Sequence, residues 1–157
     1  MTLPDEYLPR GDTAIATAYG TVYIRKGGRE ITFALHDSIT QSLHHQALFR
    51  YAAHLHDIGM TRINVDHVYF DWLDRSLSLT RGGKMLDLVY MQNARLFECE
   101  LKTTREIWLD HTAEQLREFE KHCENLIVLV PREQMENTVH LLRSINLLKT
   151  KVDTYEV

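Results

Sequence analysis

The chain has 157 residues, of which 44% are hydrophobic and 25% are charged, and its formal net charge is −4 at pH 7. This composition is typical of one ordinary globular domain and excludes disordered, collagen-like and fibrous proteins, while the acidic balance excludes a strongly basic nucleic-acid coat. The longest apolar run, over 126–130, is far shorter than the roughly 20 residues of a membrane span. With no visible secretory leader and two cysteines, we expect a protein of the reducing cytoplasm with no membrane partner.

The first part of the chain predicts a β-hairpin followed by a helix. After a leader of about 20 residues, apolar and polar side chains alternate over 21–35 around Gly27-Gly28, which is a strong hairpin signal. Ser38 and Gln41 then form a capping box at the start of a helix over 38–57. We treat residues 1–36 as an accessory element and residues 37–157 as the core domain.

The rest of the chain alternates between strand-like and helix-like segments. Short β-like runs occur over 62–70, 84–91 and 95–103, an amphipathic helix over 111–123, an apolar strand over 126–130, and a last helix over 132–148. The run over 126–130 is apolar throughout, as expected of a strand buried on both faces. The predicted fold is therefore α/β, with a mixed sheet flanked by helices and an added N-terminal β-hairpin.

The strand over 95–103 carries an unusual row of charges. Because side chains alternate along a strand, one face holds Leu96, Glu98, Glu100 and Lys102, and the other Phe97, Cys99 and Leu101. Such charges are costly in a central strand unless they meet partners or a metal ion. A two-residue turn at 92–93 would place Asp87 opposite Glu98, one pair away from Glu100.

These residue types suit metal-dependent hydrolysis. Asp87 and Glu100 can hold Mg²⁺ or Mn²⁺ through oxygen, with water completing the coordination. Lys102 can orient an attacking water or stabilise the charge that develops on a phosphate. The simpler alternative is a set of salt bridges on a solvent-exposed face, joining Glu98 or Glu100 to Lys102 and Arg95.

The segment as a whole resembles a known family. Asp87 is followed, after a gap of twelve residues, by the triplet Glu100-Leu-Lys102, then by a helix bearing Gln115 and an apolar strand. This order of motifs resembles the PD-(D/E)xK superfamily of restriction-endonuclease-like nucleases. The likeness spans about residues 38–130 and is strongest to archaeal Holliday-junction resolvases and small nucleases of plasmids and viruses. Leu86 departs from the motif, which has proline there.

The resemblance implies a restriction-endonuclease-like αβββαβ core and Mg²⁺-dependent cleavage of DNA, including branched or junction DNA. It implies that Asp87 and Glu100 bind the metal, that Lys102 is catalytic and that Gln115 approaches the site. Many members carry an acidic residue on the first core helix, and its position falls here near His45 or Gln46, neither of which is acidic. Gln46 is therefore one auxiliary candidate, and Glu98, which shares a strand face with Glu100, is another. Such domains are often homodimers; a viral protein would act in the host cytoplasm.

Basic residues surround the proposed site although the protein is acidic. Residues 75–105 contain six Lys and Arg against three Asp and Glu. We expect four of them to contact DNA phosphates: Arg81, Lys84, Arg95 and Arg105.

Other readings of the chain remain open. A domain of this fold without turnover would act as a DNA-binding or assembly module. His56-Asp57 resembles the core of HD-type phosphohydrolases, which are all-helical, whereas strands follow Gly59 here. We expect the pairs His44-His45 and His54/His56 to be surface or boundary residues, and Cys99 and Cys123 to be small core residues.

Overall fold

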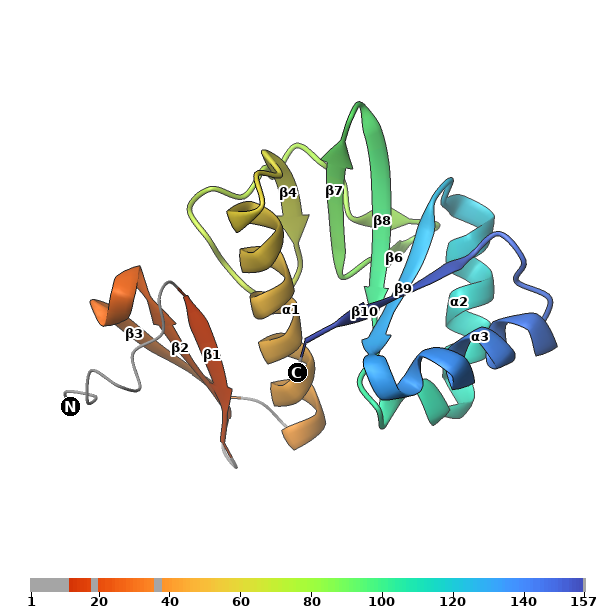
Figure 1. Cartoon of the computed structure of the whole chain (residues 1–157), viewed down its shortest axis with the longest axis horizontal. Helices are drawn as coiled ribbons and strands as arrows, with labels where there is room; N and C mark the ends of the chain where they lie inside the picture. The colour runs from red at the N-terminus through yellow and green to blue at the C-terminus, as the bar shows by residue number, and fades with distance from the viewer. Residues whose placement is uncertain (1–11, 18–19, 36–37, 157) are drawn as a thin grey trace.

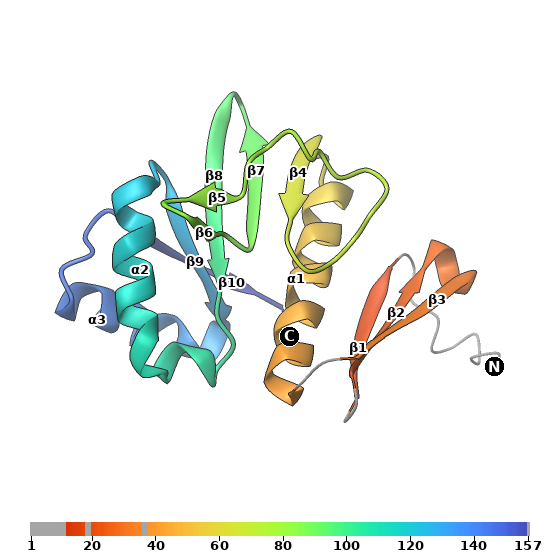
Figure 2. The same cartoon turned by 180° about the vertical axis from the view of Figure 1, so that it is seen from behind.

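The computed structural model of the chain describes residues 12–17, 20–35 and 38–156. Figure 1 shows a small N-terminal sheet, then helix α1 (Ile39–Asp57), then a larger central sheet whose far side carries α2 (Asp110–His122) and α3 (Met135–Ser144). The same layers are seen from behind in Figure 2. The chain is thus a mixed α/β protein in which α1 lies between two sheets.

The central sheet has five strands in the order β10-β9-β8-β7-β4. Their bounds are β4 (Arg62–Val65), β7 (Leu88–Gln92), β8 (Arg95–Leu101), β9 (Leu126–Pro131) and β10 (Lys151–Tyr155). Strands β4, β7 and β8 pair antiparallel, whereas β8, β9 and β10 pair parallel with α2 and α3 as crossovers. The predicted mixed sheet with helices on both faces is confirmed.

The helices form where their local signals predict them. The Ser38 side chain accepts a hydrogen bond from the Gln41 amide at 3.2 Å, which is the predicted N-terminal cap of α1. One face of α1 buries Leu48, Ala52 and Leu55 against the central sheet. No helix among the described residues has the length and the hydropathy to span a bilayer.

The N-terminal part is a three-stranded sheet rather than a hairpin alone. Strand β1 (Thr13–Ala16) lies in the segment expected to be a leader and pairs with β2 (Gly20–Arg25), which in turn pairs with β3 (Glu30–Leu35). This sheet packs on α1, where the Tyr23 ring lies 4.9 Å from Phe49 between centroids. The division of the chain at residue 36 remains a prediction.

Four further element predictions differ from the structure. The run expected over 84–91 is divided, because Lys84–Met85 pairs in a separate two-stranded sheet and the strand of the central sheet begins at Leu88. The run expected over 62–70 stops at Val65, because His67 adopts a positive φ of 68° and turns the chain, while Phe70 packs into the core. The last helix ends at Ser144 rather than at 148. Strand β10 was not predicted, because its five residues alternate only weakly and gain their pairing from β9.

A short hairpin precedes β7. Strands β5 (Thr80–Arg81) and β6 (Lys84–Met85) pair around Gly82-Gly83, where both glycines have a positive φ. A Cβ atom on Gly82 would lie 2.4 Å from the His122 ring, so this position needs glycine for space as well as for conformation. The hairpin therefore lies against the end of α2, beside the predicted site.

Candidate functional site

The hairpin of β7 and β8 brings the predicted carboxylates together. Its turn is Asn93-Ala94, with φ values of 51° and 62°, and not Gln92-Asn93 as the sequence suggested. A two-residue turn of this kind needs a positive φ at both positions, and Asn is favoured at the first of them, which is where the observed turn places Asn93. The register therefore shifts by two residues and brings Asp87 level with Glu100 instead of Glu98. A shift of two keeps every side chain on its predicted face.

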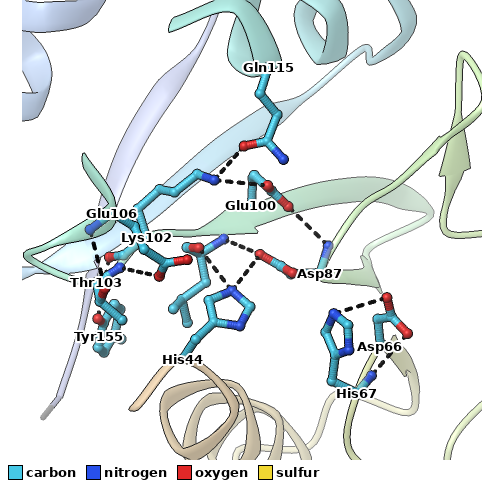
Figure 3. A network of polar contacts seen from close by, with 11 residues as sticks. His44, Asp66, His67, Asp87, Glu100, Lys102, Thr103, Glu106, Gln115 and Tyr155 are labelled. Atoms are coloured by element: carbon cyan, nitrogen blue, oxygen red, sulfur yellow. Dashed lines mark hydrogen bonds and ion pairs between the residues drawn. The ribbon is translucent and has the colours of Figure 1, made fainter. Parts of the chain in front are cut away.

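Asp87, Glu100 and Lys102 form one buried cluster, shown in Figure 3. The Asp87 amide donates to Glu100 Oε1 at 3.2 Å, and the Leu101 amide donates to Asp87 Oδ2 at 2.8 Å. Lys102 Nζ lies 3.5 Å from Glu100 Oε2 and donates to Gln115 Oε1 on α2. The structure thus brings together all four residues predicted to be catalytic, and we name them the carboxylate–lysine cluster.

The pKa values of the two carboxyl groups of this cluster are shifted in opposite directions. Burial by itself raises the pKa of Asp87, but His44 and two further hydrogen bonds outweigh it and lower that pKa. Burial, reinforced by the Asp87 charge, raises the pKa of Glu100 well above its usual range, and Lys102 only partly opposes this. Two carboxyl groups in one buried place repel each other, so a cation bound between them would be favoured.

His44 is a site residue that the sequence analysis placed wrongly. Its side chain is only 11% exposed, and its Nε2 lies 3.1 Å from Asp87 Oδ2 and 3.2 Å from the Leu101 carbonyl oxygen. Burial is the largest single effect and lowers the pKa of His44, but the charge and hydrogen bond of Asp87 together with the charge of Glu106 outweigh it, and the net shift is upward. The signal was present, because extending the apolar stripe of Leu48 and Leu55 one turn toward the N-terminus arrives at His44.

Glu98 lies on the same strand face but serves the fold. Its Oε1 accepts from Arg81 Nε at 2.8 Å, and its Oε2 accepts from the amides of Glu124 and Asn125 at 2.9 and 3.0 Å. Arg81 also donates to the carbonyl oxygens of Ser78 and Thr80. With its guanidinium held this way, Arg81 anchors the β5–β6 hairpin, and its contact with DNA remains a prediction.

The other predicted DNA-binding residues lie at different distances from the cluster. Lys84 is exposed and lines a shallow hollow of about 370 Å³ together with Gln115 of α2. Arg105 is exposed three residues after Lys102. Arg95 begins β8, at the end opposite Lys102, and its guanidinium lies 5.7 Å from the centre of the Phe97 ring. Their binding to DNA remains a prediction.

A second group of contacts fixes the chain immediately after Lys102. The Thr103 amide donates to Glu106 Oε1 at 3.0 Å, and the Tyr155 hydroxyl donates to the Lys102 carbonyl oxygen at 3.3 Å. Figure 3 shows these residues beside Lys102 and His44. Neither Glu106 nor Tyr155 was identified from sequence. Tyr155 belongs to the unexpected strand β10, and Glu106 lies in a short 3-10 helix that was not predicted.

The His56-Asp57 motif does not form the metal site of an HD-type phosphohydrolase. His56 and Asp57 are exposed at the end of α1, and the His56 ring stacks on Trp72 at 4.1 Å between centroids. The chain continues into a five-stranded sheet, so it lacks the all-helical fold that an HD-type phosphohydrolase requires. The two cysteines are free and buried, as predicted.

The oxygen donors of Asp87 and Glu100 suit a hard cation, although they are only two side chains. Among the described residues, no group of three or more His, Cys, Asp and Glu side chains is arranged to hold a metal ion. Magnesium, however, commonly binds through one or two carboxylates together with water and substrate phosphate, and Asp87 and Glu100 supply such a pair. Comparison of the chain with protein-family models, with curated proteins and with solved structures finds no match.

Proposed function

We propose that this protein is a metal-dependent nuclease that hydrolyses phosphodiester bonds of DNA, including branched or junction DNA. The observation that carries the proposal is the carboxylate–lysine cluster, in which Asp87, Glu100 and Lys102 meet in a buried place with Gln115 on the lysine. Structural salt bridges explain it poorly, because two carboxylates share the place and the pKa of Glu100 is raised rather than lowered.

The order of elements supports assignment to the PD-(D/E)xK superfamily. Helix α1, the central-sheet strands β4, β7 and β8, helix α2 and strand β9 follow one another in the αβββαβ order that the resemblance implies, with the β5–β6 hairpin inserted between β4 and β7. Asp87 directly precedes β7, Glu100 lies in β8, Lys102 directly follows β8, and Gln115 lies on α2. We include this superfamily membership in the proposal.

Asp87 and Glu100 would hold Mg²⁺ or Mn²⁺ as the cofactor. When bound, the cation supplies Lewis-acid chemistry, since it draws charge from a phosphate oxygen and acidifies water. The fit rests on the oxygen donors of the two side chains and on the mutual repulsion that a cation relieves. His44 keeps Asp87 ionised, and therefore ready to bind a cation, by the charge and hydrogen bond that lower its pKa.

Lys102 is the group best suited to the transition state. Its Nζ is held between Glu100 and Gln115, so little reorganisation is needed for it to donate to a phosphate oxygen or to a water. Gln115 positions the ammonium and leaves its charge unchanged, because an amide is neutral. The hollow beside Gln115, lined also by Lys84, would admit the DNA backbone.

The test is cleavage of DNA by the full chain with Mg²⁺, Mn²⁺ or EDTA, on plasmid, linear and branched substrates. We expect cleavage that EDTA abolishes and that Glu100→Gln abolishes, whereas Glu136→Gln, the same change at an exposed position of α3, cleaves like the wild type. Binding without cleavage under every metal would instead support the inert DNA-binding module. A homodimer is part of the proposal, and a monomer by light scattering would contradict that part.

Salt dependence tests the DNA contacts separately. Each of Lys84→Gln, Arg95→Gln and Arg105→Gln should flatten the slope of log affinity against log salt by about one unit if its side chain contacts a phosphate. Binding that is insensitive to salt would contradict the phosphate contacts.

A further inference from the structure

A pocket of about 270 Å³ lies beside the carboxylate–lysine cluster and has no role in the mechanism described so far. Helix α1 forms one wall, and the segment after β8 and the end of β10 form the others. The residues that line these walls include Leu43, Gln46, Ala47, Thr104, Arg105 and Tyr155. The pocket therefore lies where the parallel strands end, which is the usual place for ligands in α/β sheets.

The pocket shares its framework with the catalytic residues. Thr103 and Thr104, both in its lining, directly follow Lys102, and the Tyr155 hydroxyl donates to the Lys102 carbonyl oxygen at 3.3 Å. Leu43 and Gln46 flank His44 on α1, and His44 contacts Asp87. A group bound here would lie next to a phosphate held at the cluster.

The lining favours a flat, neutral group with polar edges. Leu43, Ala47 and Pro131 supply apolar surface, and Tyr155 supplies an aromatic ring. Two arginines, Arg50 and Arg105, are balanced by two glutamates, Glu133 and Glu156, so the pocket has no net charge with which to select an anion. An unpaired nucleobase matches this chemistry, since it combines an apolar face with hydrogen-bonding edges.

Gln46 supplies the pocket with a hydrogen-bonding side chain. Gln46 is a lining residue on the α1 wall, two positions after His44. Its side-chain amide carries both a donor and an acceptor, so it can pair with either kind of group on the edge of a base. Gln is a common reader of base edges.

We propose that this pocket binds one unpaired nucleobase next to the scissile phosphate. The inference rests on the proposed nuclease function and deepens it by naming a substrate class, DNA that is single-stranded or unpaired where it is cut. A base inside a continuous duplex would have to leave its stack to enter the pocket, which disfavours that substrate. Branched DNA and frayed ends offer unpaired bases at their junctions.

The first test uses the wild-type full chain and a set of single-stranded oligonucleotides, each lacking one base at a different position. Binding is followed by fluorescence anisotropy in EDTA, so that cleavage is not needed for the measurement. We expect the missing base to weaken binding roughly tenfold at one position of the footprint, as expected for the loss of one stacked base. A uniform response across all positions would overturn the inference.

The second test fills the pocket. Leu43→Trp and Thr104→Trp change partly or fully exposed lining residues, so the fold should persist, as circular dichroism would show. We expect both variants to bind single-stranded DNA roughly tenfold more weakly and to lose the position-dependent effect. Leu148→Trp is the matched control, since it places a tryptophan at an exposed leucine outside the pocket lining. Folded filling variants that bind like this control would overturn the inference.

Cleavage separates this inference from the proposed function. If the pocket binds a base, single-stranded DNA and unpaired ends are cut faster than a continuous duplex, and Leu43→Trp removes that preference. Equal cleavage of all forms overturns the base pocket and leaves the nuclease intact. The absence of cleavage with Mg²⁺ and Mn²⁺ on every DNA overturns the nuclease itself, and the inference with it.

Discussion

Asp87 and Glu100 are neighbours of the same chemical type, but their surroundings differ. Asp87 accepts from the Leu101 amide and lies 3.1 Å from His44, and both contacts stabilise its charged form. Glu100 lies against Asp87 and relies on Lys102 to oppose burial. The cation that we propose would therefore change the protonation of Glu100 more than that of Asp87.

Glu100→Gln should lower the rate of DNA cleavage at least about a hundredfold, since it removes one of two anionic oxygen ligands while keeping the side-chain volume. DNA binding should persist or tighten, because one negative charge near the phosphate is lost. Cleavage rate and anisotropy on the same oligonucleotide measure the two effects. A wild-type rate for Glu100→Gln together with a loss of activity in correctly folded Glu98→Gln would contradict our assignment.

Lys102→Ala should abolish cleavage and leave the affinity for Mn²⁺ largely intact, because lysine is not a metal ligand. Gln115→Leu removes only the group that positions Lys102, so we expect a smaller loss, on the order of tenfold. Calorimetric titration with Mn²⁺ and single-turnover cleavage separate metal binding from chemistry. A large loss of Mn²⁺ affinity in Lys102→Ala would contradict the role given to the lysine.

The two cysteines should be nearly inert toward thiol reagents in the folded protein. Burial raises the pKa of the Cys99 thiol well above its usual range, and it raises the pKa of Cys123 to about 12. Only the thiolate reacts, so labelling at pH 8 should be slow and should increase as the pH rises. Because the folded state holds the Cys123 proton more tightly than the unfolded state, its contribution to stability is lost as pH rises from about 9 toward 12. Fast labelling without denaturant would contradict this picture.

Among the elements, the β5–β6 hairpin and the loop before β9 depend on one buried carboxylate. Glu98 holds Arg81 of β5 at 2.8 Å and caps two amides at 124 and 125, and its side chain is only 4% exposed. It thereby ties β8, the strand that carries Glu100, to the β5–β6 hairpin and to the loop before β9.

Glu98→Gln should therefore act on stability more than on catalysis. Loss of the charge-assisted hydrogen bonds should lower the free energy of unfolding by about 2 kcal/mol, measured by urea denaturation. Arg81→Met removes the other partner, and the double variant should cost less than the two single changes together. Full additivity of the two changes would show that Arg81 and Glu98 do not act as a pair.

For the whole molecule, the notable feature is that α1 contacts a sheet on each side (Figures 1 and 2). The aromatic rings of Tyr23, Phe49, Phe70 and Trp72 follow one another at 4.4–4.9 Å between centroids, from the N-terminal sheet through α1 to the loop after β4. Ala14 and Tyr23 belong to the same buried cluster as residues of the central sheet. The N-terminal sheet thus covers apolar surface on the helix that carries His44.

Deleting residues 1–36 tests the division of the chain into an accessory part and a core. We expect the remaining domain to keep its mixed α/β circular dichroism spectrum and its metal binding, but to melt at a lower temperature because Phe49 loses the cover of Tyr23. Tyr23→Ala in the full chain should cost about 3 kcal/mol for the same reason. Complete unfolding of the truncated chain would show that the N-terminal sheet is part of the core.

Features that depend on neighbouring residues could be predicted from the sequence. The cap at Ser38, the buried strand over 126–130 and the shared face of Glu98, Glu100 and Lys102 follow from helix and strand periodicity or from local hydrogen bonding, and the structure confirms them. The approach of Gln115 to the site was implied by the family resemblance, and in the structure Gln115 accepts a hydrogen bond from Lys102.

Features that depend on distant segments could not be predicted in this way. The pairing that brings Asp87 level with Glu100 depends on which two residues of the turn accept a positive φ, and a shift of two residues leaves the alternation pattern unchanged. His44 and Asp87 are 43 residues apart, and Tyr155 and Lys102 are 53 apart. Periodicity reports which face of an element is buried, but packing of the whole chain determines which side chains meet there.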